Sequence, residues 1–396
     1  MVHSHAADFP GLANKQIFFD NAGGTQVVRG VTEAIVDYLT NTNAQIGASY
    51  PVSLASQKII EDAWSSAAKY INAGRDEVML GASSTQLLRN LATSLHEHIQ
   101  PGDEIVVSSI DHEANMAPWI QLAQDRGATV VWYKPTENKN PRVEAETLRT
   151  LLTSKTKLVA CTQVSNVLGS IHDAKALADV VHTIPGALFC LDGVAFAPHR
   201  AVDVTAWGVD FYAFSWYKVY GPHISTLYAS REAQKVLRII GHPYKQPNSL
   251  ENILGVAGAN YELGAAIPVV CKYLSAESGW SWDAVAAHEE RLQAILINYL
   301  LSKETVQIWG EPVADRARRV PVISFTVRNH SSKDIVDRIQ AQSNFGCKWG
   351  SFLSIRLCED YLGLDMNDGV VRVSLAHYNT EEEVTEYTRI LDGIIG

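Results

Sequence analysis

Residues 157–192 read KLVACTQVSNVLGSIHDAKALADVVHTIPGALFCLD, and this stretch decides the fold class. It holds two short apolar runs, KLVACTQV at 157–164 and ALFCLD at 187–192, separated by the helical pattern AKALADVVHTI. Short continuous apolar runs with a helix between them are typical of parallel β-strands that are covered on both faces. A right-handed crossover through the helix joins such strands. The stretch therefore predicts one strand–helix–strand unit of an α/β protein.

The same alternation continues on both sides of this unit. Further strand patterns are EIVVSSI at 104–110, ATVVWY at 128–133 and DFYAFS at 210–215. Helical patterns in the same region are STQLLRNLATSLHEHI, PWIQLAQDRG and VEAETLRTLLTS. Strands that alternate with helices favour a parallel sheet. We therefore expect the first two-thirds of the chain to form a large α/β domain.

The pattern changes after about residue 265. A long amphipathic helix, WDAVAAHEERLQAILINYLLS, is followed by the strand-like segments VQIWG, VISFTVRN and VVRVSLAHY. This arrangement indicates a smaller α+β domain. We expect an N-terminal segment at 1–16, a large domain at 17–264 and a small domain at 265–396.

Composition and charge exclude several classes of protein. The 396 residues are 46% hydrophobic and 19% charged, which is typical of a folded protein of two or three domains. The net charge of −10 gives no overall attraction to nucleic acid or to an anionic membrane, so neither is expected as a partner. The N-terminus has no signal-peptide pattern, and no run approaches the ~20 apolar residues of a membrane span, which predicts a cytoplasmic protein.

The five cysteines are scattered through the chain and form no CxxC pair. CxxC spacing is the usual sign of a zinc site or of a redox pair. We therefore expect reduced thiols and no bound metal.

Polar residues after the predicted strands mark a candidate site, because ligands of open α/β sheets bind outside the carboxyl ends of the strands. Asp192 ends one strand, and Lys218 lies in SWYKVYGP directly after another. An aspartate that holds a pyridinium proton and a lysine that forms an imine are two groups that pyridoxal 5′-phosphate (PLP) chemistry requires. A single lysine at a strand end is more often a surface residue, so the prediction depends on the pair.

Three further features fit the same site. The loop GASST at 81–85 precedes a predicted helix and offers hydroxyls and free N–H groups for a phosphate. His112 follows the strand at 104–110 and could stack on an aromatic cofactor. Asn166 follows the strand at 157–164 and could hydrogen-bond a phenolic oxygen. Each is an ordinary loop or helix-cap residue on its own, and their order along the strand ends is what favours one site.

The motifs FFDNAGG, GASSTQ, DHEANMAPW, VSNVLGSI, LDG, FSWYKVYGP and VRVSLAHYNTEEE follow one another along the chain. Together they resemble the class V aminotransferase, or cysteine desulfurase-like, family from about residue 17 to residue 390. The resemblance implies a PLP enzyme of fold type I, with a mainly parallel seven-stranded sheet in a large domain and a smaller α+β C-terminal domain. It also implies an amino-acid substrate and a homodimer with active sites at the interface.

The resemblance implies a role for each matching residue. Lys218 would form the Schiff base with PLP and later move the proton at the substrate Cα. Arg372 would bind the substrate α-carboxylate through its bidentate fork, bordered by the backbone of Ala22 and Gly23. The other cofactor-binding residues would be Asp192 at the pyridine nitrogen, His112 on the ring, Asn166 at the ring oxygen, Tyr217 beside the lysine, and Ser84, Thr85 and Ser215 at the phosphate.

Several positions depart from the family pattern. Ala195 stands where desulfurases have a glutamine and near relatives a histidine, and Tyr217 replaces the histidine before the lysine. Leu353, in KWGSFLS, occupies the place of the nucleophilic cysteine on the family's mobile loop. Cys347 lies nearby but out of register, which favours a buried thiol without a catalytic role. Persulfide transfer needs a thiolate at the loop, so the sequence argues against a cysteine desulfurase.

What these residues predict is a PLP site that forms a Cα-carbanion (quinonoid) from an amino acid. The segments GSFLSIRL and GVAGANYELG resemble a fungal subgroup that includes the PLP cyclase of the loline pathway, which forms a C–C bond by a Mannich-type reaction. The apolar Ala195 and Leu353 would leave room for a bulky substrate, which favours such a cyclase of alkaloid or secondary metabolism. The alternatives are a C–S lyase or desulfurase-like enzyme, an amino-acid epimerase and a catalytically inactive scaffold homologue.

Overall fold

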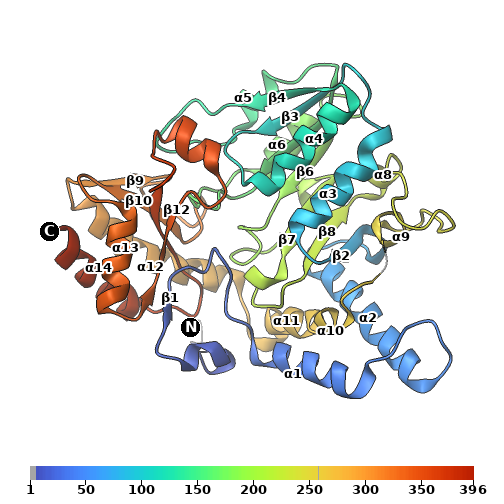
Figure 1. Cartoon of the computed structure of the whole chain (residues 1–396), viewed down its shortest axis with the longest axis horizontal. Coiled ribbons are helices and arrows are strands. Elements are labelled where there is room, and N and C mark those ends of the chain that lie inside the picture. Colours follow the sequence, from blue (N-terminus) through green and yellow to red (C-terminus); the bar gives the residue numbers. More distant parts are fainter. Residues whose placement is uncertain (1–5, 257) are drawn as a thin grey trace.

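The computed structural model describes residues 6–256 and 258–396, so residues 1–5 of the predicted N-terminal segment and residue 257 of GVAGAN lie outside it. The chain forms a larger part around one sheet and a smaller part around another (Figure 1). The large sheet has seven strands in the order β2-β8-β7-β6-β5-β3-β4. Neighbouring strands are parallel except at β8, which is antiparallel to β7 and β2. The predicted mainly parallel seven-stranded sheet is confirmed.

All the strands predicted for the large domain are present close to their expected positions. The strands of the large sheet are β2 (Val78–Gly81), β3 (Glu104–Ser108), β4 (Thr129–Tyr133), β5 (Thr156–Thr162), β6 (Leu188–Asp192), β7 (Phe211–Ser215) and β8 (Ser225–Ala229). The apolar pattern alone does not indicate β2 or β8, because VMLG is short and STLYA begins with two hydroxyl side chains.

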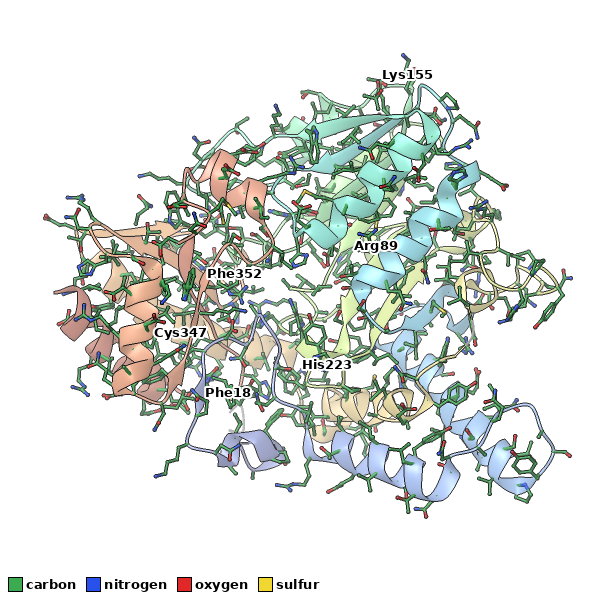
Figure 2. All side chains as sticks on the ribbon, viewed as in Figure 1. Phe18, Arg89, Lys155, His223, Cys347 and Phe352 are labelled. Carbon is green, nitrogen blue, oxygen red and sulfur yellow. The ribbon has the colours of Figure 1, made fainter. Side chains whose placement is uncertain are left out.

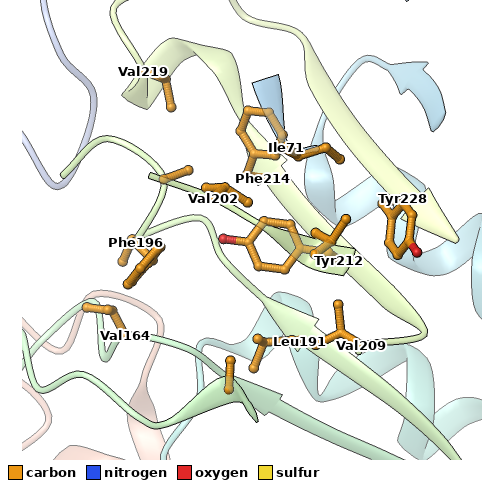
Figure 3. Close-up of a cluster of buried hydrophobic side chains, with 14 of the residues drawn as sticks. Ile71, Val164, Leu191, Phe196, Val202, Val209, Tyr212, Phe214, Val219 and Tyr228 are labelled. Atoms are coloured by element: carbon orange, nitrogen blue, oxygen red, sulfur yellow. The ribbon is translucent and has the colours of Figure 1, made fainter. Parts of the chain in front are cut away.

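Both faces of the large sheet are covered, because successive residues of a strand point to opposite sides. In β5, Leu158 packs in one apolar cluster and Val159 in the other. The first face is covered by α3 (Ser84–Ser94), α4 (Ala117–Arg126) and α9 (Leu250–Leu254), and the second by α2 (Pro51–Tyr70), α6 (Ala174–Val181) and α11 (Ile267–Tyr273). Figure 3 shows part of the second cluster, where Tyr212 and Phe214 of β7 lie near Ile71. Burial on both faces explains why the strands read as continuous apolar runs.

The smaller part has a four-stranded antiparallel sheet in the order β12-β13-β10-β9. Its strands are β9 (Val306–Trp309), β10 (Val322–Val327), β12 (Lys348–Gly350) and β13 (Val370–Ser374). The helices α12 (Trp282–Leu301), α13 (Ser332–Gln342) and α14 (Glu381–Ile395) pack on this sheet in a third apolar cluster. The predicted smaller α+β part is confirmed.

The start of the chain is joined to its end. β1 (Ile17–Phe18) pairs in parallel with β11 (Phe345–Gly346), and Asp20 bridges to Ser374, the last residue of β13. The N-terminal strand thus lies against the smaller part before the chain enters the larger one. The boundaries after residues 16 and 264 stay predictions.

Helix starts follow local capping chemistry. The side chains of Ser83, Asp173, Ser281 and Thr380 each accept a hydrogen bond from a first-turn N–H of the helix that follows. The remaining α-helices are α1 (Arg29–Asp37), α5 (Ala145–Arg149), α7 (Val204–Trp207), α8 (Arg231–Gln234) and α10 (Tyr261–Gly264). Within the described ranges, no helix combines the length and the apolar character needed to cross a bilayer. Location in the cytoplasm stays a prediction.

Candidate active site

The carboxyl ends of β6 and β7 bring Asp192 and Lys218 together. Asp192 is the last residue of β6, and Lys218 ends the short 3₁₀ turn that follows β7. Both are buried, with exposed fractions of 6% and 9%. Each lies close enough to shift the pKa of the other. Gly193, directly after Asp192, packs against Tyr212, where a Cβ would lie 1.9 Å from the Tyr212 side chain. The two residues predicted to anchor the site are therefore neighbours inside the protein.

Burial changes the charge state of Lys218. Its pKa is lowered to about 8, first by loss of hydration and then by the Arg372 guanidinium, against the opposing carboxylates of Asp192 and Asp20. Near that pH much of the amine is neutral, which is the form that attacks a carbonyl group. Burial also raises the pKa of Asp192, an effect that the Val194 N–H and Lys218 oppose.

His112 and Asp111 follow β3 on the same edge of the sheet. The Ala114 N–H donates to His112 Nδ1 (3.1 Å), which fixes the ring at the start of a 3₁₀ turn. Burial lowers the pKa of His112 to about 4, helped by Lys218 and Arg372, so the ring is neutral and suited to stacking. Asp111, which the sequence pattern did not single out, is fully buried, and burial raises its pKa to about 8.

The predicted phosphate ligands lie at the N-terminus of α3. Ser83 is the N-cap, and its hydroxyl accepts a hydrogen bond from the Gln86 N–H (3.1 Å). Ser215, at the end of β7, donates to Ser84 (3.3 Å) and shares a hydrogen bond with Ser225 (2.7 Å). Thr85 is exposed at the same turn. Hydroxyls beside the unpaired N–H groups of a helix N-terminus form an anion site.

Arg372 reaches this place from β13 of the smaller sheet. Its Nη2 donates to Asp20 Oδ1 (2.7 Å), and its Nη1 donates to the backbone oxygen of Asn166 (3.1 Å). The Phe352 ring lies over the guanidinium, 3.6 Å from its centroid to Cζ. The Nε of Arg372 is buried and finds no hydrogen-bond partner among the described residues. A ligand can accept a hydrogen bond from a buried N–H group that has no partner in the protein.

The Asn166 side chain contacts the segment that carries Leu353. Its Nδ2 donates to Phe352 O (3.0 Å), and its Oδ1 accepts from Ser354 Oγ (2.9 Å). An amide nitrogen carries two N–H groups, so one of them is left for the predicted bond to a cofactor oxygen.

Ala22 and Gly23 follow Asp20 in the chain, and Tyr217 directly precedes Lys218. The Ala22 N–H donates to Ser374 Oγ (2.9 Å), and the Gly23 N–H donates to Asp20 O (3.0 Å). Both N–H groups are therefore in use and cannot hold a carboxylate without rearrangement. The Tyr217 ring has Lys218 Nζ 5.8 Å from its centroid and stacks on His223 at 4.7 Å.

No thiolate replaces the missing cysteine of the family pattern. Cys347 is buried within the smaller part, where Tyr387 O–H donates to its Sγ (3.6 Å), and burial raises its pKa to about 11 (Figure 2). Burial also raises the pKa of the other four thiols, which belong to Cys161, Cys190, Cys271 and Cys358. The five cysteines are therefore protonated at neutral pH, and Cys347 is buried as expected.

Two residues at Arg372 were missed by the sequence reasoning. Asp20 lies in the FFDNAGG motif, where an aspartate beside a predicted carboxylate site is itself a signal for an arginine partner. Phe352 precedes Leu353, and the structure corrects the expectation for this pair, because Leu353 is 58% exposed while Phe352 faces the site. Leu353 therefore does not enlarge a buried cavity.

The residues present fit PLP. The Val194 N–H donates to Asp192 Oδ1 (2.9 Å), while Oδ2 accepts no hydrogen bond from the described residues and is left for a pyridinium N–H. Lys218 could hold the aldehyde carbon, His112 the ring face, Asn166 the ring oxygen, and Ser84 with Ser215 the phosphate. In the described ranges, no three His, Cys, Asp or Glu side chains are grouped to hold a metal ion.

Comparison with known proteins identifies the family. The sequence profile described as aminotransferase class-V matches residues 17–387. The aminotransferase-like protein FGM3 of Gibberella zeae is 51% identical over 100% of this chain and 98% of its own length. The cysteine desulfurase-like protein ustD of Aspergillus flavus is 38% identical over 100% of this chain and 90% of its own. The nonribosomal peptide synthetase-like enzyme fsqF of Aspergillus fumigatus is 40% identical over 98% of this chain, which spans 26% of that protein.

A solved structure agrees with the fold. The apo cysteine desulfurase of Thermococcus onnurineus NA1 matches with a TM-score of 0.88 and 23% identity, over 98% of this chain and 97% of that one. Because the family profile and full-length relatives cover nearly all of the sequence, this chain belongs to the class V aminotransferase family, in its cysteine desulfurase-like branch, and is a PLP-dependent enzyme of fold type I.

Proposed function

We propose that this enzyme removes the Cα proton of an amino-acid substrate and forms a C–C bond at that carbon, as a Mannich-type cyclase of secondary metabolism does. One observation carries the proposal. A buried lysine with a pKa near 8 lies beside Asp192 and Arg372, in a protein whose five thiols are all protonated at neutral pH. The site has the groups for Cα chemistry and lacks the nucleophile for sulfur transfer.

Different side chains of the site bind the substrate and transfer its proton. PLP, when bound, withdraws electrons from the substrate Cα and makes its proton removable. Arg372 binds the α-carboxylate through Nε and its remaining N–H groups, and so turns the Cα–H bond toward Lys218. Lys218 Nζ takes the Cα proton, and its lowered pKa suits this transfer near neutral pH. His112 covers the cofactor ring and excludes water.

The proposed bond formation balances without an external oxidant or reductant. Lys218 takes the Cα proton, and the electron pair left at Cα forms a bond to the carbon of a cyclic iminium. The iminium nitrogen takes up the C=N electron pair and becomes a neutral amine. The relation to an enzyme named for nonribosomal peptide synthesis supports a substrate from secondary metabolism.

The test compares Cα exchange with sulfide release. With PLP bound, an amino acid with a bulky, partly apolar side chain in D₂O should gain deuterium at Cα, followed by mass spectrometry or NMR. L-Cysteine with a reductant should release no sulfide above the rate without enzyme, because a leucine and five protonated thiols supply no acceptor. Cys347→Ala is the matched control. Robust sulfide release that disappears in Cys347→Ala would contradict the proposal and show that the enzyme is a cysteine desulfurase that uses Cys347.

The same experiment separates the remaining alternatives. An epimerase would return deuterium at Cα together with the D-amino acid, which chiral chromatography detects. A C–S lyase would release a thiol and pyruvate from a cysteine thioether. A scaffold homologue would show neither a yellow Schiff-base colour with PLP nor deuterium exchange. Any of these outcomes in place of C–C bond formation contradicts the proposed reaction.

The pH dependence of PLP incorporation gives a prediction of its own. The rate at which cofactor-free enzyme forms its Schiff base should rise about tenfold per pH unit below pH 8 and level off above it, because only neutral Lys218 reacts. The pKa of His112, about 4, lies outside this range. Stopped-flow absorbance of the Schiff-base band measures the rate. Asp111 also has a pKa near 8, so Asp111→Asn is the control, and a midpoint lost in that variant would contradict the assignment to Lys218.

We also propose that the protein is a homodimer. Five large apolar side chains are exposed on one stretch from α1 to α2, at Val36, Leu39, Tyr50, Val52 and Leu54, with exposed fractions of 42–57%. Exposed apolar side chains grouped in this way favour association. Sedimentation should give the mass of two chains, and Leu39→Glu with Leu54→Glu should shift it to that of one. A wild-type protein that sediments as one chain at micromolar concentration would contradict the proposal.

A further inference from the structure

A strained segment, Gly350–Ser354, covers the candidate active site and is named the lid. The lid begins at Gly350, which bridges to Gly369. The two backbones lie so close together that a Cβ on Gly369 would be 2.3 Å from the Gly350 backbone. Within the lid, Phe352 and Leu353 have φ angles of +53° and +57°. Bulky residues avoid this left-handed region, so two in succession are a strained conformation that surrounding contacts must hold.

The two strained lid residues place their side chains differently. Leu353 points outward and is 58% exposed. Phe352 is half-buried, and its ring centroid lies 3.6 Å from the Cζ of Arg372. Figure 2 shows Phe352 at the junction of the smaller and larger parts.

Three hydrogen bonds hold the lid against the larger part. Leu353 O accepts from the Glu113 N–H (2.8 Å), beside His112. Phe352 O accepts from Asn166 Nδ2 (3.0 Å), and Ser354 Oγ donates to Asn166 Oδ1 (2.9 Å). Strain that is held by specific bonds at a binding site points to a functional conformation rather than a loose loop.

We propose that Phe352 is a positioning residue that sets the carboxylate specificity of the site: its ring covers one face of the Arg372 guanidinium and holds the edge of the fork in place for a planar carboxylate. The inference rests on the proposed function, in which Arg372 binds the substrate α-carboxylate. It adds a second residue to that subsite and defines the substrates as α-amino acids rather than the corresponding amines.

The contacts of Arg372 support an edge-on approach. Asp20 and the Asn166 backbone occupy one N–H of each Nη, and the buried Nε has no partner among the described residues. The ring above the guanidinium keeps water from that face, which strengthens both the cation–π contact and the charge-assisted bonds at the edge. It also keeps the plane of the fork from rotating, so that two parallel hydrogen bonds to one carboxylate can form.

The experiment compares amino acids with the amines that lack their carboxylate. L-Norvaline and butylamine, and L-alanine and ethylamine, are titrated into PLP-loaded enzyme, and the absorbance of the bound cofactor gives each Kd. Phe352→Leu keeps the apolar volume but removes the aromatic face, and it should weaken the amino acids about tenfold while the amines stay within twofold. Phe352→Tyr keeps the ring and should restore wild-type affinity. Ser354→Ala, which loosens the lid, should weaken the amino acids by a smaller factor.

Kinetics give a second readout that a merely structural role would not move. Phe352→Leu should raise KM for Cα deuterium exchange about tenfold and leave kcat within twofold, because the ring orients Arg372 in the substrate complex and the transition state alike. An equal loss for amino acid and amine, or a Phe352→Tyr variant as weak as Phe352→Leu, would overturn the inference. A wild-type enzyme that responds to no amino acid would instead overturn the proposed function.

Discussion

Replacing Lys218 with alanine should abolish the covalent link to PLP and lower Cα deuterium exchange roughly 10²–10⁴-fold, the usual range for loss of a positioned acid–base group. Lys218 has a pKa near 8 and is buried at a strand end. Because the site is buried, a lysine on the protein surface cannot bring its Nζ to the same place. The variant should still bind PLP non-covalently through the residues at the ring and phosphate. Its absorbance should resemble that of the free aldehyde.

Borohydride reduction followed by peptide mapping checks this assignment. In the wild-type enzyme the label should lie on the peptide that contains Lys218, and the Lys218→Ala variant should take up none. Lys235→Ala is the matched control, because the Lys235 side chain is 67% exposed and pairs with Glu232 on the surface. A label on another lysine in the wild-type enzyme would refute the assignment.

Replacing Asp192 with alanine should weaken PLP binding roughly 10²–10⁴-fold, which corresponds to the ~3–5 kcal/mol cost of leaving one buried charge of a pair without its partner. Asp192 is 6% exposed, and its Oδ2 has no hydrogen bond from the described residues, so no nearby group takes over the bond to a pyridinium N–H. Cofactor and activity should therefore be lost together. Equilibrium titration with PLP measures the loss.

Asp192→Asn separates binding from catalysis at the same position. Asparagine keeps the shape and can still accept from the Val194 N–H, while its amide can donate to an unprotonated ring nitrogen. We expect this variant to retain much of the cofactor and to lose most Cα exchange, because an unprotonated ring withdraws electrons poorly. An alanine variant that binds PLP and exchanges at the wild-type rate would contradict the role of Asp192.

The strand ends show which parts of the site and of the fold could be predicted from the sequence alone. Asp192 and Lys218 could be predicted because they lie at the ends of apolar runs, and parallel strands place their carboxyl ends on one edge of a sheet. Ser215 was predicted only through the resemblance to the family. β2 and β8 could not, because VMLG is too short to show a period and STLYA begins with two hydroxyl side chains. Asp20 lay in a recognised motif, but its bond to Arg372 joins residues 352 positions apart.

The sequence by itself determined the fold class, through apolar periodicity, and the family, through the resemblance of its ordered motifs to known ones. It also named the residues available for PLP chemistry. Only the tertiary structure decided which side chains meet and in which charge state. Lys218, His112 and Cys347 have shifted pKa values because burial removes water from them, and burial belongs to the packed chain rather than to any local segment. Likewise, Phe352 faces Arg372 and Leu353 faces solvent because two left-handed φ angles are held by bonds from Glu113 and Asn166, residues that are distant in sequence.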